Sequence, residues 1–157
     1  MNDLRFSSLN PLRFPLVMRL YKTHYPAGKP KKDEVIWTGE GTTGLTAAVR
    51  FRQFSEFQLL TGMLVIPESR GKGVAEALLS ACQSQIICRP CFCLAFRYLV
   101  PLYQRAGFDV IERDALPNDL SGRFDSYCHS GKDLVPMKFK KPIRQSETAD
   151  ISETIET

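Results

Sequence analysis

The residues best placed to do chemistry lie in one short loop, Arg70–Ala75, within the stretch LVIPESRGKGVAEALLSAC. A loop that enters a helix leaves backbone N–H groups without internal partners, and the helix dipole adds partial positive charge there. Gly71 and Gly73 carry no Cβ, so a bulky anion can approach the backbone closely. The cations Arg70 and Lys72 would attract such an anion. The loop therefore predicts a phosphate or pyrophosphate site, with an ordinary glycine-containing turn as the alternative.

The spacing of these glycines excludes two common phosphate-binding motifs. A P-loop requires G-x-x-x-x-G-K-[ST], which the stretch ESRGKGVAE lacks. A dinucleotide fingerprint requires G-x-G-x-x-G, but the position three residues after Gly73 is Glu76. What the stretch does contain is the pattern R-x-x-G-x-A preceded by V-x-P, at Arg70, Gly73 and Ala75 and at Val65 and Pro67.

This pattern resembles the acyl-CoA-binding signature of the GNAT N-acetyltransferase superfamily. A second stretch, LYQRAGF, resembles the Y-x-x-x-G-F element of the same superfamily at Tyr103, Gly107 and Phe108. The two elements occur in the expected order with a predicted strand between them, and the resemblance covers about residues 34–139. It implies a single α/β domain with a mixed, mostly antiparallel, splayed central sheet flanked by helices. It also implies transfer of an acetyl group from acetyl-CoA to a primary amine, which attacks the thioester directly.

The resemblance further implies which residues bind acetyl-CoA. The backbone of the central strand, at Met63, Leu64 and Val65, would hydrogen-bond the pantetheine arm. The pyrophosphate would lie against the loop and the start of the next helix, at Arg70, Gly71, Lys72, Gly73, Val74 and Ala75. Tyr103 would protonate the leaving thiolate, because a phenol with a pKa near 10 suits a thiol with a pKa near 8.5. The alternative for Tyr103 is a packed helical aromatic residue.

Two departures from the superfamily pattern leave a second function open. The stretch FRYLV ahead of Tyr103 lacks the Asn that often contacts the pantetheine amides. The positions that often carry a glutamate base are occupied by Leu59, Thr61 and Cys91. We therefore assign no general base, and a non-catalytic acyl-CoA-binding or sensor module is the alternative to an enzyme.

The elements that must position these residues follow from hydrophobic periodicity and turn signals. The arginines of LTAAVRFRQF alternate with Val49 and Phe51, which predicts a half-exposed antiparallel strand. The next apolar run predicts a central strand covered on both faces. The expected strands are residues 4–7, 34–40, 45–54, 57–66, 91–96, 108–112 and 134–140. The expected helices are residues 11–25, 74–87 and 99–106, and residues 116–132 are expected to form a loop or short helix.

Composition sets the remaining limits. The chain has 157 residues, 43% of them hydrophobic, and a formal charge of +4. We predict one domain, residues 1–144, followed by an acidic disordered tail, residues 145–157. The sequence has no apolar run long enough to cross a bilayer and no secretory signal, so we expect a cytoplasmic protein that binds no membrane. Its cations are scattered, so we expect no nucleic-acid partner. A homodimer is a weaker expectation from the resemblance.

The cysteines invite a zinc interpretation that their spacing does not support. Three of the five lie in CRPCFC, at Cys88, Cys91 and Cys93. A closed zinc site usually pairs such a group with a second pair of ligands, and the two histidines are far away in the sequence. Cys91 and Cys93 would face the same side of a buried strand, where cysteine acts as a small hydrophobic residue. We therefore predict no metal.

Overall fold

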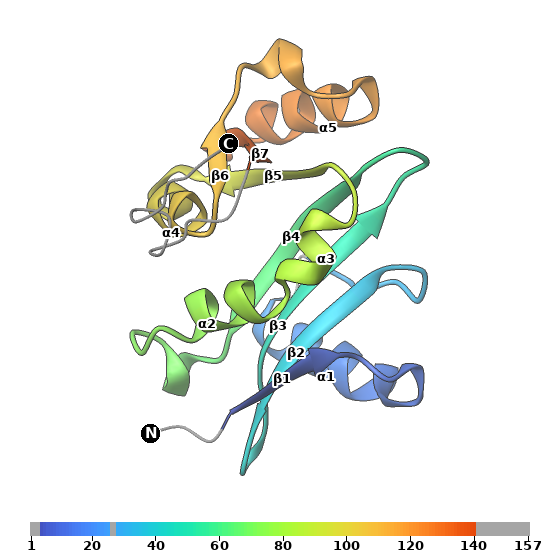
Figure 1. Ribbon diagram of the computed structural model, residues 1–157, viewed down its shortest axis with the longest axis vertical. Helices are drawn as coiled ribbons and strands as arrows, with labels where there is room; N and C mark the ends of the chain where they lie inside the picture. The colour runs from blue at the N-terminus through green and yellow to red at the C-terminus, as the bar shows by residue number, and fades with distance from the viewer. Residues whose placement is uncertain (1–3, 26–27, 141–157) are drawn as a thin grey trace, which may run out of the picture.

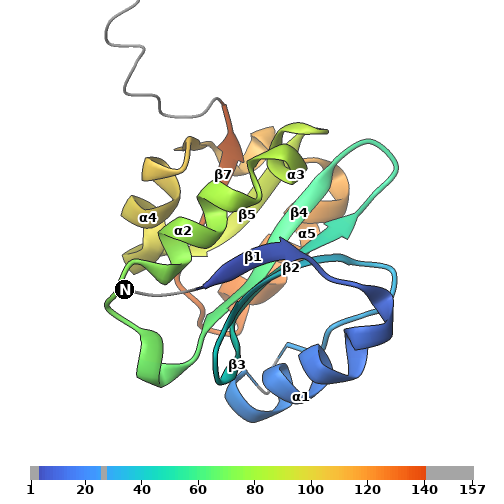
Figure 2. The same ribbon diagram turned by 60° about the horizontal axis from the view of Figure 1, so that its bottom comes forward.

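The computed structural model describes residues 4–25 and 28–140. Within them, seven strands form one sheet in the order β1-β2-β3-β4-β5-β7-β6. Helices cover both faces of this sheet, with α1 and α2 on opposite sides (Figures 1 and 2). The strands are β1 (Arg5–Ser8), β2 (Val35–Gly41), β3 (Gly44–Gln53), β4 (Gln58–Val65), β5 (Cys91–Phe96), β6 (Phe108–Val110) and β7 (Leu134–Phe139). The α-helices are α1 (Phe14–His24), α2 (Val74–Ala81), α3 (Gln83–Ile87), α4 (Val100–Arg105) and α5 (Asn118–His129).

The sheet is mixed and splayed at its centre, which confirms the predicted fold. All described strand pairs are antiparallel except β4 and β5, which run parallel. Those two strands pair only from Gln58 to Leu60 of β4, opposite Cys91 to Cys93 of β5. They then diverge, as Figure 1 shows. The remainder of β4, residues 61–65, therefore has an edge that β5 does not cover.

A β-bulge in β4 sets which side chains face each side of the sheet. Arg50 of β3 pairs with Thr61, but two positions earlier Ala48 pairs with Leu64, so β4 contains one extra residue. Gly62 lies in this bulge with a φ of 65°, a left-handed conformation that favours glycine. An extra residue exchanges the two faces of a strand. The bulge puts Met63 and Val65 on the same face as Leu60, and both parities of β4 are apolar because hydrophobic clusters cover both faces of the strand, as predicted.

Three hydrophobic clusters hold the helices to the sheet. The largest packs α2 and α4 on one face, against residues such as Val49, Phe51 and Leu60. On the opposite face, α1 packs Val17 and Tyr21 against the sheet. Beside it, α5 packs on that same opposite face through a third cluster, formed by Leu59, Phe92, Leu116 and Leu120. The two faces meet at the splay between β4 and β5, where a ligand on one side can reach groups on the other.

Most expected elements are confirmed, with three corrections to the helices. Residues 74–87 form two helices, because the backbone leaves the helical conformation at Cys82 (φ −98°, ψ 24°). Residues 11–25 were expected as one helix, but residues 11–13 form a 3₁₀ turn, and α1 after it buries Val17 and Tyr21. Residues 118–129, expected as a loop or short helix, form the full-length helix α5.

The prediction that the arginine side of β3 is exposed is wrong. Val49 and Phe51 are buried on one face as predicted, but Arg50 on the other face is only 6% exposed. The reason is that Tyr21 of α1 and Glu34, just before β2, pack against its guanidinium group. The predicted boundary at residue 144 and the acidic tail lie outside the described residues.

Candidate functional site

The glycine loop has the open geometry that an anion site needs. Gly71 and Gly73 have φ values of 76° and 77°, and a Cβ built on either would meet nothing within 4 Å. Gly73 caps α2, and the first hydrogen bond of that helix runs from the Ala77 N–H to the Gly73 carbonyl at 3.0 Å. The N–H groups of residues 74–76 therefore lack acceptors within the helix. These donors at the positive end of the helix dipole suit a phosphate group.

The two cations of the loop play different parts. The Arg70 Nε donates a hydrogen bond to the Val65 carbonyl at 2.9 Å, which ties the loop to the end of β4. The Lys72 side chain lies in the exposed part of the loop. The Arg70 side chain therefore holds the loop in position. Its hydrogen bond uses the Val65 carbonyl, which was predicted to bind the pantetheine arm. The backbone at Met63 and Leu64 lies on the part of β4 that has left β5.

Tyr103 lies in the core at the splay. It is 4% exposed, on α4, and its ring meets Phe108 edge-on with centroids 5.8 Å apart. Burial raises the pKa of Tyr103 well above its ordinary value, and the nearby Cys93 and Tyr25 raise it further. Burial also raises the pKa of the Cys93 thiol to about 12, although a hydrogen bond with Tyr103 lowers it in part. The Tyr103 phenol is therefore protonated at neutral pH and available only to a group that enters the splay.

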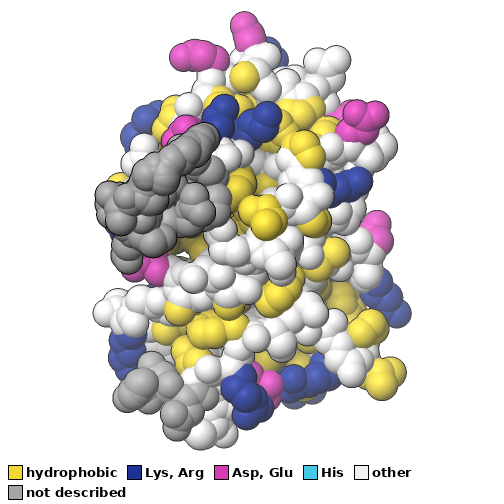
Figure 3. Space-filling view, viewed as in Figure 1, with side chains coloured by type: hydrophobic (Ala, Val, Ile, Leu, Met, Phe, Trp, Pro, Cys, Tyr) yellow, Lys and Arg dark blue, Asp and Glu magenta, His cyan; other side chains and the backbone are white. Residues whose placement is uncertain are grey.

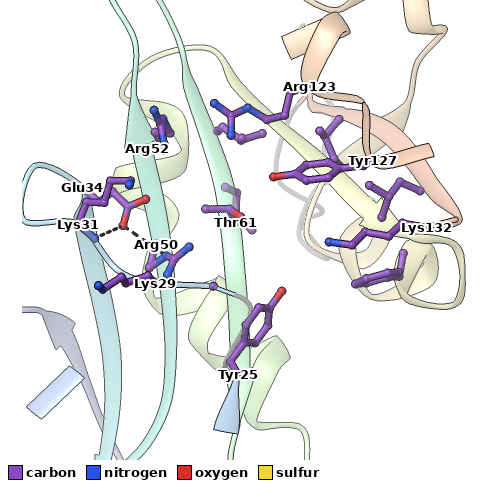
Figure 4. Close-up of a pocket in the computed structure, with 16 residues that line it drawn as sticks. Tyr25, Lys29, Lys31, Glu34, Arg50, Arg52, Thr61, Arg123, Tyr127 and Lys132 are labelled. Atoms are coloured by element: carbon purple, nitrogen blue, oxygen red, sulfur yellow. Dashed lines mark hydrogen bonds and ion pairs between the residues drawn. The ribbon is translucent and has the colours of Figure 1, made fainter. Parts of the chain in front are cut away.

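A cavity of about 630 Å³ lies on the other side of the splay (Figure 4). Its floor includes Thr61 of β4, and its walls are the loop before β2, the strand β3 and the helix α5 with the loop that follows it. The hydroxyls of Tyr25 and Tyr127 point into it. Six cations line it: Lys29, Lys31, Arg50, Arg52, Arg123 and Lys132. The one carboxylate among its described lining residues is Glu34.

Arg50 and Glu34 form a buried ion pair at the edge of this cavity. The Arg50 Nε lies 3.4 Å from a Glu34 oxygen, and the two side chains are 7% and 3% exposed. The Glu34 carboxylate also accepts a hydrogen bond from the Lys31 backbone N–H at 2.9 Å. Arg50 further lies over the Tyr21 ring, 4.8 Å from its centroid. The Nε contact with Glu34 is longer than an ordinary hydrogen bond, and the Arg50 Nη1 has no hydrogen-bond acceptor among the described residues.

The structure brings the predicted residues to one region but adds residues that the sequence did not indicate. The loop, the free end of β4 and Tyr103 surround the splay from the α2 side. The cationic cavity on the opposite side was missed, because its lining residues come from segments that are far apart in the sequence. The alternation of arginines in β3 was the available signal, and it was interpreted as a half-exposed face. Tyr21 and Trp37 pack in or against the core, whereas Tyr25 lines the cavity.

The sequence of this region matches a known protein family. Residues 35–121, more than half of the chain, match the family model described as an acetyltransferase (GNAT) domain. The chain belongs to the GNAT acetyltransferase family. This confirms the family that the two sequence elements indicated, while no curated protein matches the chain.

Solved structures of GNAT proteins share the fold at low identity. A Neisseria gonorrhoeae N-acetylglutamate synthase, complexed with coenzyme A and N-acetyl-glutamate, has a TM-score of 0.64 and 15% identity over 88% of this chain. This chain spans only 35% of that synthase. Arabidopsis thaliana Naa50, in complex with the bisubstrate analogue CoA-Ac-MVNAL, has a TM-score of 0.64 and 9% identity over 88% of this chain and 99% of its own. The Escherichia coli ribosomal-protein-S18-alanine N-acetyltransferase has a TM-score of 0.60 and 12% identity, covering 92% and 97%.

No group of three or more His, Cys, Asp or Glu side chains in residues 4–25 and 28–140 could hold a metal ion. None of the helices in the same ranges combines the length and the apolar character that crossing a bilayer requires.

Proposed function

We propose that the protein transfers the acetyl group of acetyl-CoA to a primary amine by direct attack of the amine on the thioester. The observation that supports this most is the splay of β4 from β5, flanked by a glycine loop on one side and Tyr103 on the other. GNAT family membership supports the same activity. Acetyl-CoA would supply the activated acetyl group.

The residues of the chain fit such a cosubstrate. Gly71 and Gly73 leave open space above their backbone, and the amides at Val74 and Ala75 lack helical acceptors, so the loop would hold the pyrophosphate. The uncovered edge of β4, at Met63 and Leu64, presents peptide groups of the kind that a pantetheine amide can pair with.

In the reaction, the chain would supply one proton and the positions of the reactants. The amine nitrogen bonds to the acyl carbon, the bond from that carbon to sulfur breaks, and Tyr103 gives its proton to the departing thiolate. The extra proton on the amine goes to water, and the phenolate takes a proton back from water. Because burial raises the pKa of Tyr103, the phenol is fully protonated before each turnover.

The experiment is isothermal titration with acetyl-CoA, followed by detection of thiol release with a panel of primary amines. We expect saturable binding with a Kd below about 100 μM and a confirmed acetylated product. Absence of acetyl-CoA binding would contradict the proposal, because the glycine loop and the free edge of β4 are already formed without the ligand. Tight binding without turnover of any amine would instead support the non-catalytic module.

Two further expectations belong with this function. The five cysteines are all free, which supports the proposal of a reducing, cytoplasmic compartment. The homodimer stays a prediction. The identity of the amine is not set by the fold, since one neighbour was crystallised with N-acetyl-glutamate and another with a peptide analogue.

A further inference from the structure

We propose that the amine acceptor is a small molecule that also carries an anionic group, a carboxylate or a phosphate, and that the cationic cavity binds this group. The inference rests on the proposed function and names the class of substrate for the same site. Its basis is the charge of the cavity, where six cations face a single carboxylate.

The cations come from different elements and converge on one space. Lys29 and Lys31 lie in the loop before β2, Arg50 and Arg52 on β3, and Arg123 on α5, with Lys132 in the following loop. Figure 4 shows Arg123, Lys132 and the Tyr127 hydroxyl directed into the cavity from the α5 side, opposite the side formed by β3 and the loop. Only Arg50 among the six pairs with a carboxylate in the described part of the chain.

The buried donors separate this cavity from an ordinary solvated surface. Arg50 is 6% exposed and its Nε lies 3.4 Å from Glu34, yet its Nη1 has no hydrogen-bond acceptor among the described residues. The Arg123 Nε is also buried and, within the same residues, without an acceptor. A buried donor without a partner is destabilising by roughly 1–3 kcal/mol. These nitrogens have almost no accessible surface, so a ligand carboxylate or phosphate in the cavity would meet the guanidinium groups, which match both anions in shape, and would accept from the buried nitrogens only after the guanidinium groups turn toward it.

The place and size of the cavity fit a small acceptor. The cavity reaches Leu60 and Thr61, where the pairing of β4 with β5 stops. An amine held there would lie at the splay, with its anionic group against the surrounding cations. A volume of about 630 Å³ is typical of small-molecule sites.

The face that carries α2 and α3 has charged side chains of both signs, mainly around its periphery (Figure 3). A nucleic-acid surface would instead need a broad basic patch. The same cavity should repel polyamines, because their several positive charges would meet uncompensated cations.

The first experiment compares amines that differ in charge. With saturating acetyl-CoA, we expect kcat/KM for O-phosphoethanolamine to exceed that for ethanolamine by tenfold or more. The same holds for β-alanine against β-alaninamide, and these two pairs distinguish a phosphate from a carboxylate. One charge-assisted hydrogen bond corresponds to a change of this size. A preference for the amines that lack an anionic group, or for spermidine, would overturn the inference while leaving acetyltransfer intact.

The second experiment removes one wall cation. Arg123→Gln should raise the KM for the favoured anionic amine about tenfold, with little change in kcat or in the Kd of acetyl-CoA. The KM for the matching amine without an anionic group, ethanolamine or β-alaninamide, should not change. The matched control is Arg19→Gln, which removes an exposed arginine of α1 outside the cavity and should change nothing. Equal effects of the two variants would mean that Arg123 does not bind the acceptor.

A binding measurement keeps the inference testable if none of these amines is acetylated. Inorganic phosphate and succinate are titrated into the CoA-loaded protein, and into the free protein if CoA does not bind. We expect saturable binding with a Kd on the order of 1 mM, weakened by Arg123→Gln and unchanged by Arg19→Gln. No saturable binding of either anion would overturn the inference. Failure of CoA binding alone would overturn only the proposed function.

Discussion

Replacing Tyr103 by Phe should separate chemistry from binding. The substitution removes one buried hydroxyl and keeps the ring, so the edge-on contact with Phe108 at 5.8 Å is retained. The hydroxyl has the Cys93 thiol beside it, and a thiol is a weak partner. Its loss should therefore lower the free energy of unfolding by no more than about 1 kcal/mol. The hydroxyl is predicted to serve the leaving thiolate and not the pyrophosphate, so the Kd of acetyl-CoA should change by less than about threefold, well under the 1.4 kcal/mol that a tenfold change represents.

The effect on turnover should be much larger. Loss of a general acid typically lowers kcat by about 10² to 10⁴, equivalent to roughly 3–5 kcal/mol in the barrier. The loss should grow for acyl donors whose thiols have higher pKa values, because those thiolates depend most on protonation. The assays are thiol release for kcat, calorimetry for Kd and urea unfolding for stability. The matched control is Tyr98→Phe, at a tyrosine that is 77% exposed. If Tyr103→Phe abolished CoA binding or unfolded the protein, the hydroxyl would be structural and the catalytic role wrong.

Three further changes test the loop, the bulge and the thiols. Gly73→Glu should weaken acetyl-CoA binding in calorimetry by well over tenfold, whereas Gly73→Ala, with the same backbone strain and no charge, should weaken it far less; equal losses would argue against an anion site. Gly62→Ala should lower the free energy of unfolding in urea by about 1–3 kcal/mol, because its φ is 65° and its Cβ would lie 3.0 Å from a buried guanidinium nitrogen. Gly131→Ala, with a φ of 96° and open space around it, should cost less, and no difference between the two would contradict the bulge. Burial raises the pKa values of Cys82 and Cys93 from 9.0 to about 12. The unfolded chain therefore releases thiol protons that the folded protein retains, and stability measured in urea should fall as pH rises from 9 toward 12. Constant stability over that range would show that these thiols are accessible.

The sequence predicted the parts of the site that are local in the chain. The loop from Arg70 to Ala75 and the Y-x-x-x-G-F element at Tyr103 are contiguous patterns, and their elements were placed to within a few residues. The splay was implied by the family resemblance and is visible in the short pairing of β4 with β5. Each of these features depends on a strand, a turn and a helix that are neighbours in sequence.

The cationic cavity could not be predicted in the same way. Lys29, Arg50 and Arg123 border one space only because the sheet order places β3 beside β4 and β4 beside β5. Alternation showed that Arg50 and Phe51 face opposite sides of β3, but not that Tyr21 of α1 and Glu34 cover the arginine side. The helix α5, which supplies Arg123, has only Leu120 fully buried. Its weak apolar stripe explains why it was expected as a loop or short helix.

The charge of the cavity also bears on the missing general base. The one carboxylate among its described lining residues, Glu34, is held by Arg50 and by the Lys31 amide, so it is poorly placed to take a proton. In the acceptor site that we propose, surrounding cations would lower the pKa of a bound ammonium group, because like charges disfavour the charged form. The neutral amine, which is the nucleophile, would then be populated near neutral pH by loss of a proton to water. The same cations would repel a simple ammonium ion before it bound, and an anionic group on the acceptor offsets that repulsion. The two roles are therefore divided: the carboxylate or phosphate of the substrate draws the molecule into the cavity, and the cations of the cavity favour the neutral, reactive form of its amine.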